Sequence, residues 1–430
     1  MHDEPTQTRS TLSLRSGSGQ APDPDSHALG VFVSSGFREL SSALVVTDGR
    51  GLASRPLIEA SAVMSIPDET AALYQELATG RSTPPGAAAT LAARVADLAA
   101  TAIERLSADA PAARHAHLVG VHDPGLWRLS GRHRAYQTLC DADRLAEATG
   151  LNVVGAFPGR DLACGGLGGP LMAIPQWLLL RHADRTRVLL DLGRTIQLTY
   201  LPPSSGDAAS RILSFDVGPG MSLLDRLTTE LTGGNEAFDP GGRLAVQGRR
   251  IDELVEHWLQ DPYFKRLPPR WHPLGCRHER ELAQTVQMAV EAGWNVRDLL
   301  CTGCHFIAET CARAIRQRLL QTPPIDELLL TGGGQHNGMV LRELAARLPE
   351  LKMIRVADLS IKDEAVEAAC AALLARLHVE QVPANHITVT GAETSRVLGQ
   401  LAPGAPRNWQ KLIQEMASNR PAVMSLRSAV

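Results

Sequence analysis

Two strand-like segments that each run into a glycine-rich turn constrain this chain more than any other feature. The first is SFDVGPGMSLLD (residues 214–225), in which Asp216 follows an apolar run and Gly218 and Gly220 flank a proline. The second is LLLTGGGQHN (residues 328–337), again a strand pattern feeding a glycine turn. Backbone N–H groups can approach an anion closely where no Cβ intervenes. Two such turns predict a nucleotide held between them, with the Asp216 carboxylate nearby.

These motifs resemble those of the anhydro-N-acetylmuramic acid kinases, a branch of the sugar-kinase and actin-like ATPase superfamily that carries FDTGPGN and GGGxHN. The similarity extends from about Gly30 to about Gly404. It includes RDLACGGLGGPL (residues 160–171), which matches the family's RDxAxGGxGxPL, and it includes residues 363–368 and 389–392. The resemblance therefore covers nearly the whole chain.

The resemblance implies an α/β, two-lobed actin-like ATPase or sugar-kinase fold with mixed sheets flanked by helices. Strand and helix patterns that alternate along the chain indicate an α/β class on their own. The domains expected are a disordered tail, an N-terminal lobe with the first phosphate hairpin and the sugar contacts, a C-terminal lobe with the second hairpin and both glycine turns, and a C-terminal tail. Their bounds are residues 1–28, 29–185, 186–404 and 405–430.

The activity implied is the ATP-dependent hydrolytic opening of 1,6-anhydro-N-acetylmuramic acid to the 6-phosphate, a step of peptidoglycan recycling. ATP and Mg²⁺ are the implied cofactors, and the anhydrosugar is the implied partner. Asp216 takes the role of general base, for which a carboxylate with a raised pKa is suited. The other interpretation of Asp216 is a turn cap that accepts hydrogen bonds from nearby backbone N–H groups.

Three glycines form the turn expected on the adenosine side: Gly332, Gly333 and Gly334. A strand before them and a helical pattern after them, at residues 337–348, fit a nucleotide-binding loop. The alternative is an ordinary strand-to-helix turn.

The two hairpins that cradle phosphate in the family depart from its pattern here. The first, GVFVSSGFRELS (residues 30–41), offers Ser35 and Gly36, but Arg38 and Glu39 stand where the family has Asp and Gly. A side chain and a negative charge at Glu39 would crowd and repel a phosphate, and Arg38 would offset part of this as a cation.

The second hairpin, DLGRTIQLT (residues 191–199), resembles NIGGIANxT; it keeps Gly193 and has Arg194 in place of a glycine. Met221 replaces the Asn that follows GPG in the family. These departures fall on the expected phosphate and sugar contacts.

Sugar contacts are expected from Arg160, Asp161 and His122. Arg160 and Asp161 could bind a carboxylate and hydroxyls, or they could form an ion pair at the start of a helix. His122, where the family has the His of SHGQT, could instead be an ordinary core or surface residue.

Composition points to a soluble enzyme. The 430 residues are 44% apolar and 21% charged, enough for two domains with a sizeable core. A formal net charge of −3 and only 4% aromatic residues favour neither nucleic acid nor a membrane surface as a partner. The expected location is the cytoplasm, and the sequence leaves the oligomeric state open, a homodimer included.

Seven cysteines, an odd number, argue for reduced thiols rather than a disulfide framework. The segment CTGCH (residues 301–305) matches the attachment pattern of a c-type haem, and metal binding is a second interpretation. A third is that these are small core side chains on an amphipathic helix over residues 295–320.

Three functions remain open from the sequence. One is the anhydrosugar kinase, another is a kinase for a different sugar, and the last is a non-catalytic sensor or binding protein that kept the fold.

Overall fold

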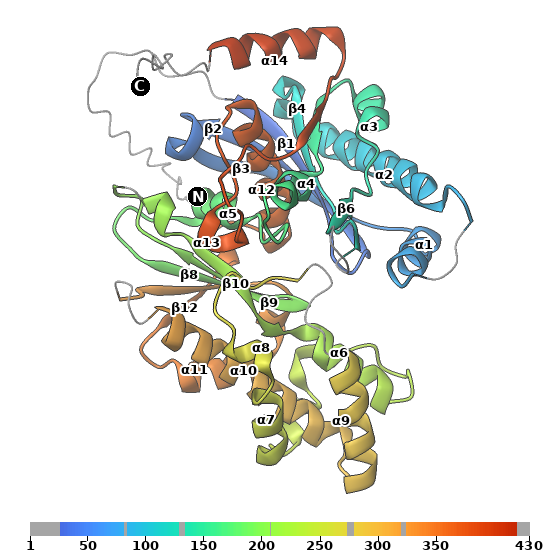
Figure 1. Cartoon of the computed structure of the whole chain (residues 1–430), viewed down its shortest axis with the longest axis vertical. Coiled ribbons are helices and arrows are strands. Elements are labelled where there is room, and N and C mark those ends of the chain that lie inside the picture. Colours follow the sequence, from blue (N-terminus) through green and yellow to red (C-terminus); the bar gives the residue numbers. More distant parts are fainter. Residues whose placement is uncertain are drawn as a thin grey trace, which may run out of the picture.

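The computed structural model describes residues 26–80, 84–128, 134–206, 208–272, 279–319 and 324–418. Two mixed sheets lie one above the other along the long axis of the molecule, each with helices against it (Figure 1). Most of the expected N-terminal tail lies outside the described residues. Its last three residues, 26–28, already belong to the first strand.

The upper sheet has an antiparallel half and a parallel half. Strands β1, β2 and β3 form an antiparallel meander, while β4 and β7 follow on the other side of β1, each parallel to its neighbour. In spatial order its strands are β13 (Gln400–Ala402), β7 (Asn152–Gly155), β4 (Leu118–His122), β1 (Ser26–Val33), β2 (Glu39–Asp48) and β3 (Arg55–Ser65).

The lower sheet repeats this plan. Its first three strands, β8, β9 and β10, are antiparallel, and β11 and β12 continue on the far side of β8 in parallel. In spatial order its strands are β10 (Leu213–Pro219), β9 (Thr195–Leu201), β8 (Arg187–Leu192), β11 (Glu327–Thr331) and β12 (Lys352–Arg355). The same strand order in both sheets confirms the two-lobed duplication that the resemblance implies. A small separate ribbon pairs β5 (Leu126–Arg128) with β6 (Ala135–Gln137).

Helices cover both sheets, and a further group forms the lower end of the molecule (Figure 1). Those with the upper lobe are α1 (Asp68–Ala78), α2 (Ala87–Asp109), α3 (Ala142–Thr149), α4 (Phe157–Ala163), α5 (Ala173–Leu180), α12 (Asp363–Val379), α13 (Ile387–Thr390) and α14 (Pro406–Ser418). Those with the lower lobe are α6 (Met221–Leu231), α7 (Asp252–Leu259), α8 (Pro262–Lys265), α9 (Glu279–Ala292), α10 (Val296–Leu319) and α11 (Gly338–Arg347).

Helix α12 packs directly on the upper sheet through two glycines. A Cβ at Gly30 would lie 1.8 Å from the carbonyl oxygen of Ala368, and one at Gly120 would lie 2.0 Å from that of Ala371. Any side chain on β1 or β4 at these points would push the helix away. Gly30, the first residue of the expected phosphate hairpin, therefore serves helix–sheet packing.

The last part of the chain returns to the upper lobe. Strand β13 pairs with β7, and α14 contacts both β7 and α12. The expected bounds gave residues 186–404 to the C-terminal lobe and called residues 405–430 a tail, whereas α12, β13 and α14 pack with the first sheet and α13 contacts β10 of the second. Order along the sequence alone could not reveal this crossover.

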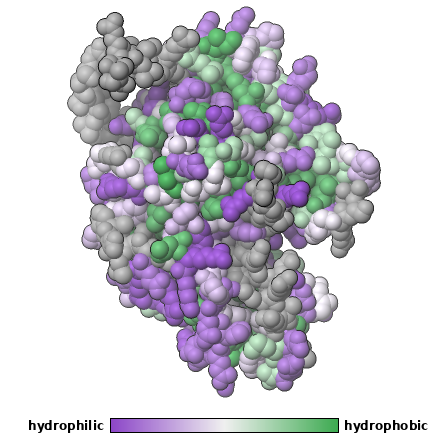
Figure 2. Space-filling model, in the orientation of Figure 1, coloured by the Kyte–Doolittle hydropathy of each residue, from purple (hydrophilic) through white to green (hydrophobic). Residues whose placement is uncertain are grey.

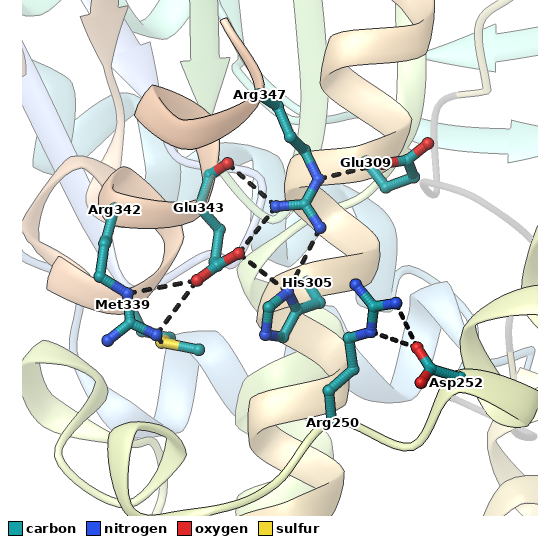
Figure 3. A network of polar contacts seen from close by, with 8 residues as sticks. All are labelled: Arg250, Asp252, His305, Glu309, Met339, Arg342, Glu343 and Arg347. Atoms are coloured by element: carbon teal, nitrogen blue, oxygen red, sulfur yellow. Dashed lines mark hydrogen bonds and ion pairs between the residues drawn. The ribbon is translucent and has the colours of Figure 1, made fainter. Parts of the chain in front are cut away.

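The CTGCH segment lies inside α10. Cys301 and Cys304 are buried in the apolar core of the lower lobe, which explains their spacing by core packing. The His305 side chain is engaged as well, because its Nδ1 lies 2.9 Å from a carboxylate oxygen of Glu343 on α11 (Figure 3). Arg347 joins Glu343 to Glu309, so this network ties α10 to α11 (Figure 3).

One face of the molecule shows how polar and apolar side chains are distributed over the two lobes (Figure 2). On the side shown in Figure 2, hydrophilic side chains cover much of the lower part and apolar ones form small separate groups above. In the described ranges, none of the helices combines the length and the apolar character required to cross a membrane.

Candidate active site

Asp216 lies within strand β10 rather than at its end. The strand continues to Pro219, and its register against β9 shifts between Asp216 and Gly218, which marks a β-bulge. Because β10 is the edge strand of its sheet, a proline there costs no ladder hydrogen bond. The expected Gly-Pro-Gly turn is thus mostly strand, and it is the bulge that re-aims the Asp216 side chain.

The Asp216 carboxylate is buried and accepts few hydrogen bonds from the protein. The residue is 3% exposed, and its side chain accepts hydrogen bonds from the backbone N–H of His272 at 3.1 Å and from the Gln197 amide at 3.4 Å. Burial raises the pKa of this carboxyl to about 7, against the smaller opposing effect of those two hydrogen bonds. A carboxylate with such a pKa can accept a proton near neutral pH.

The backbone around Asp216 is fixed by the segment that follows α8. Its N–H donates to the carbonyl of Arg270 at 2.8 Å, and its own carbonyl accepts from Arg270 Nε at 2.7 Å. The Tyr263 hydroxyl donates to the same carbonyl at 3.3 Å. Asp216 is therefore held in place while its carboxylate keeps room for further partners.

The sequence did not indicate three further acidic residues: the charge of Asp191 acts on Asp216, and those of Asp363 and Glu367 interact in turn with Asp191. Burial raises the pKa of Asp191 to about 6 and that of Glu367 to about 8, and the charges of Asp191 and Asp363 add to the effect on Glu367. The Asp363 carboxylate accepts a hydrogen bond from Gln335 Nε2 at 2.7 Å. Two signals could have found this group: Asp191 is the next-to-last residue of a mostly buried strand, and Asp363 and Glu367 are four residues apart at the start of a helix.

The three glycines of the turn after β11 have different roles. A Cβ at Gly332 would lie 2.3 Å from Asp191 Oδ1, and one at Gly334 would lie 2.7 Å from the Leu192 side chain. A Cβ at Gly333 would meet no atom within 4 Å. Gly332 and Gly334 are thus required by packing against β8, whereas Gly333 is the one that faces open space.

Gly193, Gly218 and Gly220 belong to the same packed centre. A Cβ at Gly220 would lie 2.2 Å from the carbonyl oxygen of Gly193, and one at Gly218 would lie 2.9 Å from the Phe264 ring. The N–H of Gly193 donates to Asp191, an interaction that moderates the raised pKa of that carboxyl. The second hairpin, the β10 segment and the glycine turn therefore converge at Gly193.

The first hairpin joins β1 to β2 through residues 34–38. Ser34 accepts hydrogen bonds on its side chain from the N–H groups of Arg38 and Glu39 at 3.3 and 3.1 Å, and Phe37 is buried against Tyr74. Ser35 is exposed, as are Arg38 and Glu39. The hairpin is well packed on one side and open at its tip.

The Asp161 side chain is buried, and both of its carboxylate oxygens accept hydrogen bonds within the protein. It is 0% exposed, and its carboxylate accepts hydrogen bonds from Gly168 N–H at 2.8 Å and from the Asn385 amide and Thr390 hydroxyl at 2.7 Å each. These contacts join α4 to the loop before α5 and to α13. Asp161 therefore positions the loops around it, and only its neighbour Arg160 is exposed.

His122 ends strand β4 among aromatic rings. It stacks on Phe32 with centroids 5.9 Å apart and lies 6.3 Å from the Phe157 ring. Burial lowers its pKa to about 4, so the imidazole is neutral at physiological pH, and its Nδ1 has no hydrogen-bond partner among the residues that the structure describes. The next residue, Asp123, accepts four hydrogen bonds that close the following turn, from Gly125 and residues 136–139.

The structure thus brings together Asp216, the second hairpin and the glycine turn. The first hairpin is close to them as well, because a Cβ built on Gly36 would lie within 4 Å of the Arg194 side chain. Buried carboxylates beside open glycine backbone can hold a phosphorylated ligand and move a proton.

Comparison with known proteins agrees with these features. The sequence pattern of the family described as anhydro-N-acetylmuramic acid kinase matches residues 30–404. A protein of that name from Synechococcus sp. (strain WH7803) is 34% identical over 298 residues, covering 66% of this chain and 76% of the relative. One from Synechocystis sp. is 30% identical over 393 residues, covering 87% and 98%.

Solved structures similar to this one are remote. A ROK hexokinase from Thermus thermophilus is 14% identical with a TM-score of 0.38, covering 82% of this chain and 99% of that one. The family match, by contrast, spans residues 30–404, which include most of both sheets and the glycine turns of the site. The chain therefore belongs to the anhydro-N-acetylmuramic acid kinase family.

Proposed function

We propose that this protein opens 1,6-anhydro-N-acetylmuramic acid with water and transfers a phosphoryl group from ATP to the oxygen released. The observation that carries this proposal is the buried Asp216 carboxylate, with its pKa raised to about 7, beside the convergence of the second hairpin and the glycine turn. Family membership supplies the substrate class. The product is N-acetylmuramic acid 6-phosphate, and the process it serves is peptidoglycan recycling.

In this mechanism Asp216 takes a proton from the attacking water. The water oxygen forms a bond to the anomeric carbon, the bond from that carbon to the bridging oxygen breaks, and this oxygen attacks the terminal phosphorus of ATP, so that ADP leaves. Burial suits Asp216 to this role because a base of pKa near 7 is both deprotonated and proton-accepting at neutral pH. The main-chain contacts to Arg270 keep the carboxylate aimed.

Nucleotide binding is assigned to the open glycine backbone. Gly333 faces free space, and Ser35 and Gly36 lie at the open tip of the first hairpin. Gly193, Gly218, Gly220, Gly332 and Gly334 support this site indirectly, because their missing side chains let its strands and turns pack together.

Mg²⁺ fits the acidic residues of this site. Asp191, Asp363 and Glu367 all have pKa values raised by burial, and a cation would relieve their repulsion. Among the described residues, no three His, Cys, Asp or Glu side chains are grouped to hold a metal by themselves. Mg²⁺ would therefore be held by one or two of these carboxylates together with phosphate oxygens, and it would neutralise charge on the transferred group.

The sugar is assigned to the side of His122 and Arg160. The neutral His122 ring carries an unpartnered Nδ1 that can hydrogen-bond a hydroxyl, and the exposed Arg160 cation can pair with the lactyl carboxylate. Asp161 would act by fixing the loop that follows α4.

Mass analysis of the product tests the reaction. After incubation with ATP and the anhydrosugar, the product should gain one phosphoryl group and the elements of one water molecule. A product that gained the phosphoryl group alone would indicate an ordinary sugar kinase, and no phosphorylated product would overturn the proposal.

A further inference from the structure

The tip of the second hairpin carries a cation where a glycine would suffice. Arg194 adopts no left-handed backbone conformation, so a side chain fits there without strain. Its carbonyl oxygen accepts hydrogen bonds from Gly220 N–H at 2.9 Å and from the Ser222 hydroxyl at 2.6 Å. The backbone of Arg194 is therefore fixed to the start of α6, although its side chain is exposed.

The Arg194 side chain extends from the lower lobe to the first hairpin of the upper lobe. Its Cδ and Nη1 lie 3.8 and 3.9 Å from the position that a Cβ would take on Gly36. Its charge also acts on Tyr74, which packs beneath that hairpin through Phe37. The guanidinium thus stands between the tips of the two hairpins.

The Arg194 guanidinium is not paired with an acidic group of the described residues. In the parts of the chain that the structure describes, neither Arg194 nor Arg38 forms an ion pair or a side-chain hydrogen bond. Asp225 is the acidic residue whose pKa both arginines lower, yet it lies beyond ion-pair distance of either, and burial still holds its pKa above the ordinary value. Both arginines therefore act on one partly buried carboxyl without pairing with it, and Glu39 is the acidic residue exposed beside Arg38 at the first hairpin.

We propose that Arg194 binds a phosphate group of the nucleotide from across the gap between the two hairpins, with Arg38 adding positive charge on the opposite side. This inference rests on the proposed function, because it assigns the phosphate contacts of the same site. A planar guanidinium offers paired N–H donors that match phosphate oxygens. Arg194 would be a binding residue that links the two lobes through the ligand. Its side chain would contact the phosphate where a glycine at this position would offer only its backbone.

Calorimetric titration of the full-length protein with ATP and with adenosine tests this assignment. Arg194→Ala should weaken ATP binding roughly ten- to hundredfold, the effect of losing a hydrogen-bonded charge partner, and should leave adenosine binding unchanged. Arg194→Lys should retain part of the affinity, because it keeps the charge and loses the planar fork. Arg105→Ala removes an exposed arginine of α2 and is the matched control for net charge.

The outcomes separate the inference from the function on which it rests. Wild-type protein that binds ATP and turns over the sugar, together with an Arg194→Ala variant of unchanged or higher ATP affinity, would overturn the inference alone. Higher affinity would mean that the side chain blocks the site. Equal losses for ATP and adenosine would also overturn it, since they would indicate a disturbed fold. A wild type that binds no ATP would overturn both.

Discussion

The Asp216 carboxylate accepts a hydrogen bond from the backbone N–H of His272, 3.1 Å away, although the two residues are 56 positions apart in the sequence, with α6, α7 and α8 between them. This contact opposes the effect of burial only in part, so the pKa of Asp216 stays near 7. The hydrogen bond from His272 orients the carboxylate through the main chain. The other carboxylate oxygen, Oδ1, accepts the longer hydrogen bond from the Gln197 amide, at 3.4 Å.

Replacing the proposed base should slow turnover without weakening nucleotide binding. Asp216→Asn keeps the shape of the side chain but cannot accept a proton at neutral pH. Steady-state kinetics should show a loss of roughly 10²- to 10⁴-fold in kcat, the range for removal of a general base. Near-normal turnover would identify Asp216 as a mere cap of the bulge.

The pH dependence of stability offers a second view of Asp216. Its folded pKa of about 7 exceeds the ordinary 3.8, so between these values the folded state binds a proton that the unfolded state releases. The contribution of Asp216 to the free energy of unfolding should therefore fall as pH rises through this window. Urea denaturation of wild type and Asp216→Asn should show the variant gaining relative stability from about pH 5 to pH 8. A constant difference would contradict the raised pKa.

Gly333 gives a test of nucleotide binding that spares the fold. Because a Cβ there meets no atom within 4 Å, Gly333→Val should fold normally and obstruct only the ligand. ATP at about 100 times its dissociation constant should stabilise the wild type by roughly 2.7 kcal/mol, and this gain should vanish in the variant.

Gly334→Val is the matched control for that experiment. Its Cβ would lie 2.7 Å from Leu192, so overpacking should destabilise the apo protein itself by about 1–3 kcal/mol. If Gly333→Val retained the full ATP-dependent stabilisation, the glycine turn would not be the nucleotide site.

Glu39 should hinder phosphate binding at the first hairpin. The residue is exposed at the start of β2, beside the open tip, so Glu39→Gln removes its charge and keeps its size. Two like charges about 4 Å apart repel by about 1 kcal/mol where water screens them, so ATP affinity should rise roughly fivefold in a titration at low salt. A weaker affinity would mean that the hairpin does not face phosphate.

Asp161 should matter for stability more than for binding. Asp161→Ala would leave the Asn385 amide, the Thr390 hydroxyl and the Gly168 N–H buried without this hydrogen-bond acceptor. The loss should lower the free energy of unfolding by about 2–4 kcal/mol. Chemical denaturation measures this cost. A stable variant with a raised KM for the sugar would instead restore Asp161 as a substrate contact.

The sequence predicted the glycine turns and hairpins because strand patterns and glycine runs are local signals, and the duplication of the sheet was implied by the family resemblance. It could not reveal that α12 returns to the upper lobe through Gly30 and Gly120, since this is a contact between distant segments. The same limit hid the role of Asp161, whose partners Asn385 and Thr390 lie more than two hundred positions away. It also concealed the acidic group of Asp191 and Glu367, which forms only when β8 meets α12.

Consumption of ATP in the presence of 1,6-anhydro-N-acetylmuramic acid tests the central claim most directly. A coupled assay of ADP release should show turnover that depends on the anhydrosugar, saturates with it, and falls by roughly 10²-fold or more in Asp216→Asn. Wild-type protein that binds ATP but releases no more ADP with the sugar than without it would contradict the proposed kinase.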